Sequence, residues 1–205
     1  AADLAGIPAQ NLVIGDSKGR IGWRLTAQLP HRAGTCEATA PLAVADGCRW
    51  AGWLPPTENP SLVDPADGIL WTANNRTLDG DALQLVGDAG YANGARARQI
   101  RDALRAKPVF TEADLLAIQL DDRALFLARW HQALQDEAAR SGSAELKALA
   151  EAARAWDGRA SAGSASYRIV RGWRLAVVER IQNGLLAPAQ AALGQRFVMP
   201  DLPQM

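Results

Sequence analysis

Residues 69–76 read Ile-Leu-Trp-Thr-Ala-Asn-Asn-Arg, an apolar run that ends in two amides and a cation. The run over 69–73 predicts a β-strand, because branched and aromatic residues favour strands. An amide at the end of a rigid strand can offer a neutral N–H donor to a developing oxyanion. Asparagine pairs are also typical of turns, since asparagine tolerates left-handed backbone conformations. The pair by itself leaves both interpretations open, and the sequence on either side has to decide between them.

The first half of the chain has the pattern of strands and loops. Residues 11–15 and 21–25 predict two strands, and the residues Asp-Ser-Lys-Gly between them predict a hairpin turn. Residues 29–68 are rich in proline and show little periodicity, so we expect an ordered but irregular connection. Trp50 and Trp53 are expected to anchor this connection by packing.

The sequence from residue 94 onward is typical of helices. One helix is expected over 95–106, because the proline at 108 discourages its continuation. The residues Thr-Glu-Ala-Asp from Thr111 form a capping-box-like start for the next helix. Apolar residues at helical spacing predict the buried faces of the later helices: Leu127, Trp130, Leu134 and Ala138; Leu146, Leu149, Ala150 and Ala153; and Ile169, Trp173, Val177 and Ile181 in a helix from Ser166 to about Leu186.

Composition narrows the classes of function. Lys and Arg together number 22, as do Asp and Glu, so the formal net charge is zero and no overall field attracts nucleic acid. No apolar stretch approaches the roughly 20 residues that cross a bilayer. His31 and His131 are the only histidines, and neither pairs with a cysteine at zinc-ligand spacing. We therefore expect no nucleic-acid partner, no membrane and no zinc.

Three further features bear on the context of the chain. Cys36 and Cys48 are spaced suitably for a local disulfide, and equally for two unpaired thiols in a cytosolic protein. The few predicted strands make a sheet that is marginal unless something covers it. Residues 197–205 continue neither a helix nor a strand. We expect this chain to be a segment of a larger protein.

A succession of short motifs extends along nearly the whole chain. In order they are PAQNLVIGD at 8–16, GRIGW at 19–23, WAGWLP at 50–55, NP at 59–60, PADG at 65–68, WTANNR at 71–76, the turn at 96–100, KP at 107–108 and WDG at 156–158. This succession resembles the middle of the β-subunit of the penicillin acylase (penicillin amidase) family of N-terminal nucleophile hydrolases. The resemblance is strongest over residues 8–108. It implies an α+β fold, a fragment of an αββα hydrolase, with 1–93 as a strand-and-loop segment of the catalytic core and 94–205 as a helical segment.

The resemblance implies an amidohydrolase that is made as a precursor and cut autocatalytically into α and β chains. Its nucleophile would be the new β-chain N-terminus, usually serine, whose own α-amine acts as the base. An α-amine with a pKa near 8 can accept the hydroxyl proton without any histidine. The partners would be the rest of the β-subunit and the α-subunit of the same precursor. Placement in the periplasm or outside the cell comes with the resemblance, and it favours the disulfide between Cys36 and Cys48.

The implied substrate is a small N-acyl compound, such as a β-lactam with its acyl side chain or an acyl-homoserine lactone. Gln10 falls where a family member has an apolar residue that lines the acyl pocket. If Gln10 lines the same pocket here, the acyl group is expected to be different or more polar.

Two residues carry the implied catalytic site. Asn74 matches the family's oxyanion-hole asparagine, whose amide N–H would bond the negative oxygen of the tetrahedral intermediate. Arg96 stands where the family has an arginine close to the nucleophile, and its guanidinium could orient Asn74. The alternative for Arg96 is an exposed helix residue, which is what we expect of Arg98, Arg101 and Arg105 on the same helix.

Two features depart from the family's pattern. The chain begins Ala1-Ala2-Asp3, without Ser, Thr or Cys in first place, so the nucleophile is expected upstream and this segment alone is expected to be inactive. Asp79, Asp81 and Asp88 lie near the family's calcium ligands, but Leu85 occupies the position where a carboxylate is expected. We therefore assign no metal or other cofactor to these residues, and calcium in the full-length enzyme stays open.

Two interpretations compete with that of a hydrolase segment. The first is a non-catalytic binding or interaction module that has kept the acylase scaffold. The second is a small helical adaptor unrelated to hydrolases, which must treat the Trp-Thr-Ala-Asn-Asn-Arg context as coincidence. A Gly-Ser processing junction in the upstream coding sequence would favour the enzyme, and a start codon close to Ala1 would favour the module.

Overall fold

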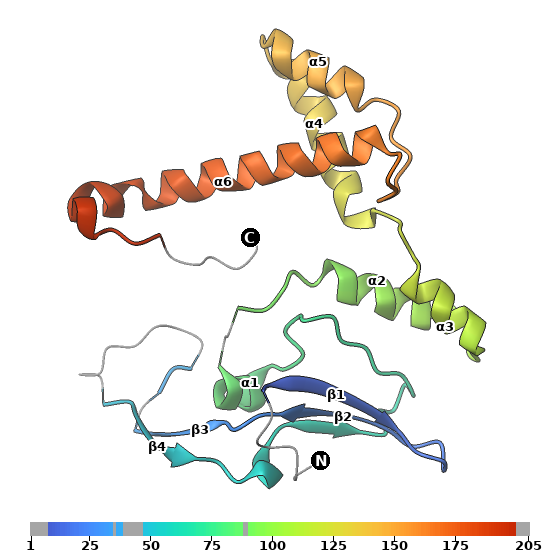
Figure 1. Ribbon diagram of the computed structural model, residues 1–205, viewed down its shortest axis with the longest axis vertical. Coiled ribbons are helices and arrows are strands. Elements are labelled where there is room, and N and C mark those ends of the chain that lie inside the picture. Colours follow the sequence, from blue (N-terminus) through green and yellow to red (C-terminus); the bar gives the residue numbers. More distant parts are fainter. Residues whose placement is uncertain (1–7, 35, 39–46, 88–89, 200–205) are drawn as a thin grey trace. The chain divides into compact units, whose positions relative to one another are not determined.

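The computed structural model describes residues 8–34, 36–38, 47–87 and 90–199 (Figure 1). The chain divides after Lys107 into two compact units, and each unit is described by itself. The first unit holds every strand of the described residues together with two helices, and the second is helical, so the chain is α+β as expected. The finer αββα arrangement stays a prediction.

The predicted hairpin is confirmed. Strand β1 (Gln10–Gly15) pairs antiparallel with β2 (Ile21–Thr26), and β2 pairs with β5 (Ser61–Val63) to complete a three-stranded sheet. The turn forms because the Asp16 carboxylate accepts the backbone N–H groups of the residues that follow it, and because Gly19 adopts a positive φ of 78°. The Arg20 side chain also donates to Asp16 and lowers the pKa of that carboxyl.

The expectation of an irregular connection over residues 29–68 is wrong. The connection contains β5 and a second antiparallel sheet made of β3 (Pro30–Ala33) and β4 (Arg49–Trp53). Strands this short offer too few positions for a period of two to be visible in the sequence. A 3-10 turn, η3 (Pro56–Glu58), precedes β5.

The expectation that two tryptophans anchor this connection is also wrong. Trp50 is 70% exposed and Trp53 is 56% exposed, and their rings contact each other with centroids 6.0 Å apart. Asn59 is the anchor instead. Its side chain is buried, and its amide donates to the carbonyls of Leu25 (3.0 Å) and Ala27 (2.8 Å) at the C-terminal end of β2. A buried amide that satisfies two backbone carbonyls fixes the chain better than a ring that water can reach.

Cys36 and Cys48 form a disulfide in the structure, with their Cα atoms 5.0 Å apart. We expect that opening this bond lowers the free energy of unfolding by about 3 kcal/mol, because a crosslink over a loop of this length removes conformational entropy from the unfolded chain. Denaturant unfolding of a variant with both cysteines replaced by serine measures the change. Intact-mass analysis with alkylation, before and after reduction, tests the bond itself, and two free thiols in the unreduced protein would refute it.

The second unit holds four helices in its described residues: α3 (Glu112–Gln119), α4 (Leu125–Arg140), α5 (Ala144–Ala152) and α6 (Ala165–Leu193). The capping box at the start of α3 is confirmed, because the Thr111 hydroxyl accepts the Asp114 N–H while the Asp114 carboxylate accepts the Thr111 N–H. In the ranges that the structure describes, no helix combines the length and the apolar character that a bilayer crossing requires.

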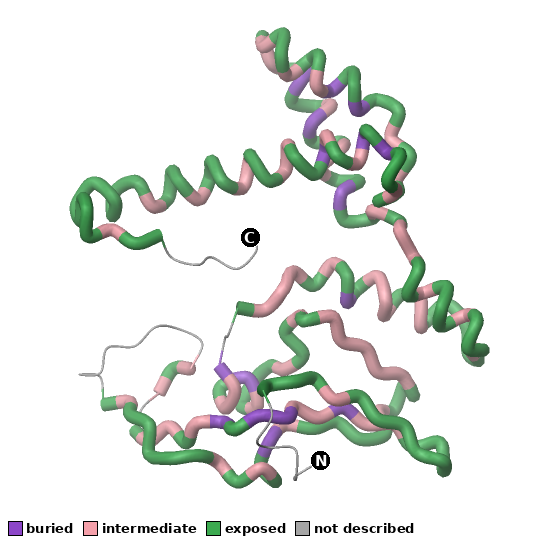
Figure 2. The backbone as a smooth tube through the Cα atoms, viewed as in Figure 1, coloured by how far each residue is buried: buried purple, intermediate pink, exposed green. Residues whose placement is uncertain are grey.

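The core of this unit lies where α4, α5 and the first part of α6 meet (Figure 2). Its buried residues are Leu127, Leu134, Ala138, Ala150, Ala153 and Val170. Trp130, Ile169 and Trp173 pack against them, as expected. The prediction for Ile181 is wrong: its side chain is 52% exposed, because α6 extends to Leu193 and its second half leaves the core.

The Trp-Asp-Gly motif at 156–158 builds the corner that leads into α6. Trp156 stacks on His131, with the ring centroids 5.2 Å apart. Asp157 accepts the Arg159 backbone N–H and the Ser164 hydroxyl, and these two bonds lower its pKa. Ser164 in turn caps α6 by accepting a backbone N–H of the first turn. The motif therefore has a structural role in this unit.

Candidate active site

The apolar run at 69–73 is not a β-strand, which corrects the prediction from its sequence. The described residues form two sheets, β1-β2-β5 and β3-β4, and the run belongs to neither. A strand exists only where a neighbour completes its backbone hydrogen bonds, and residue composition alone cannot supply that neighbour. The segment instead precedes α1 (Gly80–Val86). It is contacted by the side chains of Arg96 in α2 (Ala95–Leu104) and of Arg105, the C-cap residue of that helix.

The two asparagines after this run have different roles in the local structure. Asn75 closes the turn, because its side-chain oxygen accepts the Ala73 N–H (3.0 Å) and its side-chain amide donates to the Arg76 carbonyl (2.8 Å). Asn74 adopts the left-handed conformation, with φ of 59°, which asparagine tolerates better than most residues. Its backbone carbonyl accepts the Ala92 N–H (2.7 Å). The turn uses Asn75, so the carboxamide of Asn74 is not needed to build it.

Arg96 holds the carboxamide of Asn74 from the first turn of α2. Its Nη2 atom donates to the Asn74 side-chain oxygen (2.8 Å) and to the Ala73 carbonyl (2.7 Å). A guanidinium has no acceptor, so the amide atom that faces it must be the oxygen. The amide nitrogen of Asn74 therefore points away from the guanidinium, and both side chains are exposed. The structure thus brings these two predicted site residues into direct contact.

The beginning of α2 places Arg96 at this point. Asn93 accepts the Ala95 N–H (2.9 Å), and Gly94 is the N-cap residue. Ala97, in the same first turn, is buried with 3% of its surface exposed. Sequence reasoning missed Asn93, although an asparagine two residues before a predicted helix is a recognisable start signal.

This arrangement favours negative charge. The carboxamide presents neutral N–H donors, and a fixed guanidinium polarises it from the other side. The positive end of the α2 dipole lies in the same first turn. Preorganised donors of this kind stabilise charge that develops during a reaction without reorganising.

Gln10 belongs to a different part of the hydrogen-bonding network from Asn74 and Arg96. It is the first residue of β1, opposite Thr26, and its side chain is exposed. Its backbone carbonyl accepts the Thr26 hydroxyl (3.3 Å). Among these described residues, the structure shows no hydrogen bond from Gln10 to Asn74 or Arg96. Its assignment to an acyl pocket stays a prediction.

The acidic residues considered for calcium lie around α1. Asp79 is the N-cap residue, Asp81 is in the first turn, and Asp88 lies outside the described residues. Leu85 contributes its backbone carbonyl to a hydrogen bond from Arg32 (2.8 Å). Within the described portion of the chain, no three His, Cys, Asp or Glu residues come together as a metal site would require.

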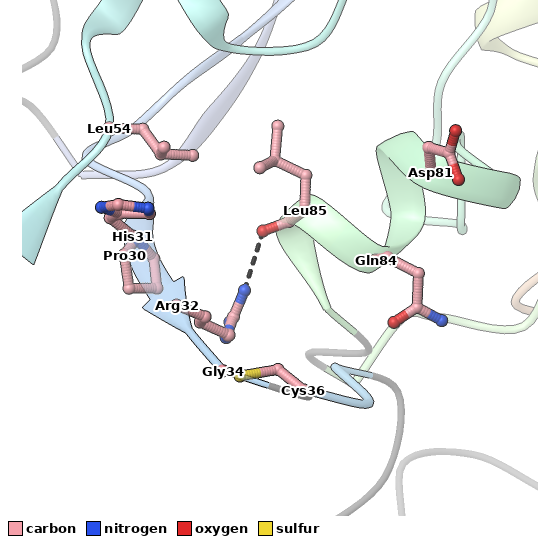
Figure 3. A pocket seen from close by; sticks show the side chains of 9 residues that line it. All are labelled: Pro30, His31, Arg32, Gly34, Cys36, Leu54, Asp81, Gln84 and Leu85. Carbon is pink, nitrogen blue, oxygen red and sulfur yellow. Dashed lines mark hydrogen bonds between the residues drawn. The ribbon is translucent and has the colours of Figure 1, made fainter. Parts of the chain in front are cut away.

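A separate open cavity of about 290 Å³ lies between β3 and α1 (Figure 3). Its lining includes His31 and Arg32 from β3 and Gln84 from α1. The Arg32 guanidinium points at the carbonyl near the end of α1 and satisfies it, which is a favourable place for a cation. Asn74 and Arg96 do not line this cavity, so it is distinct from the oxyanion-donor pair.

The chain is similar to known acylases in both of the sequence comparisons that follow. The family model described as penicillin amidase matches residues 1–203. The chain is 30% identical over 196 residues to the penicillin acylase 2 proenzyme of Pseudomonas sp. (strain SE83), covering 95% of this chain and 24% of that protein. It is 33% identical over 121 residues to the acyl-homoserine lactone acylase QuiP of Pseudomonas aeruginosa, covering 58% of this chain and 14% of that protein.

A solved structure is also similar. The thermostable penicillin G acylase from Alcaligenes faecalis aligns with a TM-score of 0.48 at 21% sequence identity, covering 72% of this chain and 27% of that chain. The chain described here spans about a quarter of the length of the penicillin acylase 2 proenzyme.

Proposed function

The chain belongs to the penicillin amidase family, and we propose that it is part of an amidohydrolase that cleaves N-acyl amide bonds. Family membership removes the interpretation as an adaptor unrelated to hydrolases. The observation that carries the proposal is the contact in which Arg96 holds the oxygen of the Asn74 carboxamide and leaves its N–H groups to face away. The activity belongs to the full-length protein, and the 205 residues alone are inactive in this proposal.

In the proposed reaction Asn74 acts on the acyl-transfer step. A nucleophilic hydroxyl adds to the carbonyl carbon of the amide, and the carbonyl oxygen becomes an oxyanion. The Asn74 amide donates an N–H to that oxygen and lowers the energy of the tetrahedral intermediate. Collapse of the intermediate expels the amine, which takes up the proton that the hydroxyl lost. Water then hydrolyses the acyl-enzyme and releases the acid.

Arg96 has two roles in this proposal. Its two bonds to Ala73 and Asn74 fix the direction of the donor before substrate binds. Its positive charge also favours the neutral form of an α-amine nearby, which a base must have to accept the hydroxyl proton. The proposal places that amine and the nucleophile at a serine in the rest of the β-subunit.

The remaining features of the proposal concern context. The α-subunit and the rest of the β-subunit of the same precursor are the protein partners, and one relative is named as a proenzyme. The disulfide fits placement in the periplasm or outside the cell. The substrates are small N-acyl amides; the relatives are named for penicillin and for acyl-homoserine lactones. Gln10 would favour an acyl group with a polar substituent.

Assay of the full-length protein against a panel of N-acyl amines tests the proposal. The panel should include a β-lactam with an apolar acyl side chain, an acyl-homoserine lactone, and a hydroxylated version of each. We expect hydrolysis of at least one pair, with the hydroxylated member preferred if Gln10 lines the pocket. Binding of these compounds without any hydrolysis would instead support a non-catalytic module on the same scaffold.

A further inference from the structure

We propose that Arg105, at the C-terminal end of α2, is a positioning residue for the oxyanion donor. This inference rests on the proposed function. Arg105 differs from Arg96 in that it does not contact Asn74; it contacts the segment that leads to it. The sequence predicts an exposed helix residue at this position, as it does for Arg98 and Arg101. Arg105 is exposed in the structure, and its side chain also contacts two residues of the segment before Asn74.

Arg105 makes two contacts with the segment before Asn74. Its Nη2 atom lies 3.1 Å from the carboxylate of Asp67, and its guanidinium carbon lies 5.5 Å from the centroid of the Trp71 ring. Trp71 is partly buried, so the cation lies over an aromatic face that has limited access to water. Arg105 is also the C-cap residue of α2, where a cation is favoured by the helix dipole.

The position of Asp67 is itself fixed by a turn. The Gly68 N–H donates to the Pro65 carbonyl (2.8 Å), and Gly68 adopts a positive φ of 67°. This turn comes from the PADG motif, which the proposed function does not otherwise use. Arg105 therefore joins three elements: the turn, the Trp71 ring and the end of α2.

Arg96 and Arg105 contact the segment 67–74 from the two ends of α2. Asp67 and Trp71 contact the C-terminal end through Arg105, and residues 73 and 74 contact the N-terminal end through Arg96. Residues 67–74 therefore run antiparallel to α2. Arg96 and Arg105 are nine positions apart, roughly 13.5 Å along the helix axis, so they contact the segment from opposite ends of α2. A segment held at one point can pivot about it, and a second contact removes that freedom.

Loss of Arg105 is expected to change the catalytic rate more than the stability of the fold. The ion pair is about half exposed on both sides, and exposed ion pairs contribute little to stability. A displacement of about 1 Å at a catalytic group, in contrast, can cost on the order of 100-fold in rate. We expect loss of Arg105 to let the Trp71 end of the segment shift, and so to broaden the directions in which Asn74 donates.

The test compares variants of the full-length processed protein. Arg105→Met keeps an unbranched apolar stem and removes the charge and the donors, and Arg105→Lys restores a cation near the ring and Asp67. Arg98→Met is the matched control, since Arg98 is an exposed residue of the same helix. We expect Arg105→Met to lower kcat about tenfold with KM and Tm nearly unchanged. Arg105→Lys should recover most of the loss, and Arg98→Met should behave as the parent protein.

A double variant separates positioning from other causes. If Arg105 acts through Asn74, adding Arg105→Met to Asn74→Gly should lower kcat little further. Parent-like kcat in Arg105→Met overturns the inference, and so does a full further tenfold loss in the Asn74→Gly background. An equal loss in Arg98→Met would also overturn it. Near-normal turnover of Asn74→Gly alone would instead reject the proposed function.

Discussion

Asn74→Gly is expected to lower kcat for N-acyl amide hydrolysis by on the order of 100- to 1,000-fold in the full-length protein, because it removes one oxyanion donor. Glycine is the informative replacement at this position. Asn74 has a φ of 59°, which glycine adopts without strain, so the backbone can keep its course. Alanine would add a backbone penalty of about 1–2 kcal/mol and mix a folding defect with the catalytic one.

Asn74→Asp tests the donor role of the carboxamide separately from the shape of the side chain. The carboxylate has nearly the shape of the carboxamide and can still accept the hydrogen bond from Arg96, so the local structure should persist. An ionised carboxylate only accepts, and it would face the oxyanion with a like charge. We therefore expect Asn74→Asp to lose at least as much activity as the glycine variant. Steady-state kinetics with thermal unfolding as a folding control measures both, and turnover within a few-fold of the parent protein would reject the oxyanion assignment.

Arg96→Met is expected to lower kcat by about 10- to 100-fold. Of the two hydrogen bonds of the guanidinium, the one to Asn74 holds the donor directly, and a bond to a charged group contributes about 1.5–3 kcal/mol. Loss of that amount from the transition state corresponds to this range of rates, since about 1.4 kcal/mol is tenfold. The kcat of Arg96→Lys should lie between those of the parent protein and Arg96→Met, because a single ammonium on a shorter stem makes the bonds to Ala73 and Asn74 poorly.

The kinetic pattern distinguishes the two proposed roles of Arg96. If Arg96 only orients Asn74, the losses in Arg96→Met and Asn74→Gly should overlap in the double variant. If it also keeps an α-amine neutral, the kcat of Arg96→Met should depend on pH differently from that of the parent protein. Arg98→Met is again the control. Unchanged kcat in Arg96→Met at every pH would contradict both roles.

Much of the local structure could be predicted from the sequence because short-range interactions determine it. The β1–β2 hairpin follows from its turn residues, and the start of α3 follows from the Thr111 capping box. The core positions on α4 follow from helical spacing, which repeats over enough turns to be recognised. Each of these features is decided by residues that are close together in the chain.

Predictions failed where a distant partner decides the outcome. The run at 69–73 has the residues of a strand, yet no described strand pairs with it, and Arg96 and Arg105 contact it instead. Trp50 and Trp53 have the residue type of a core anchor, but buried Asn59 performs that function through the carbonyls beside it. Residue composition indicates which secondary structure a segment can form, but the segment's actual neighbours depend on the tertiary fold.

The candidate site shows the same division. The sequence shows which types of residue are available: an amide pair after an apolar run, a stretch with four arginines at 96–105, and the order of motifs that places the chain in its family. The order of motifs already indicated that Arg96 orients Asn74, and the two side chains are in contact in the structure. The contact of Arg105 with Trp71 depends on the fold, because the spacing of the arginines gives no reason to prefer Arg105 over Arg98. Local periodicity determines which face of a helix a side chain occupies, but the residues that contact this face come from elsewhere in the chain.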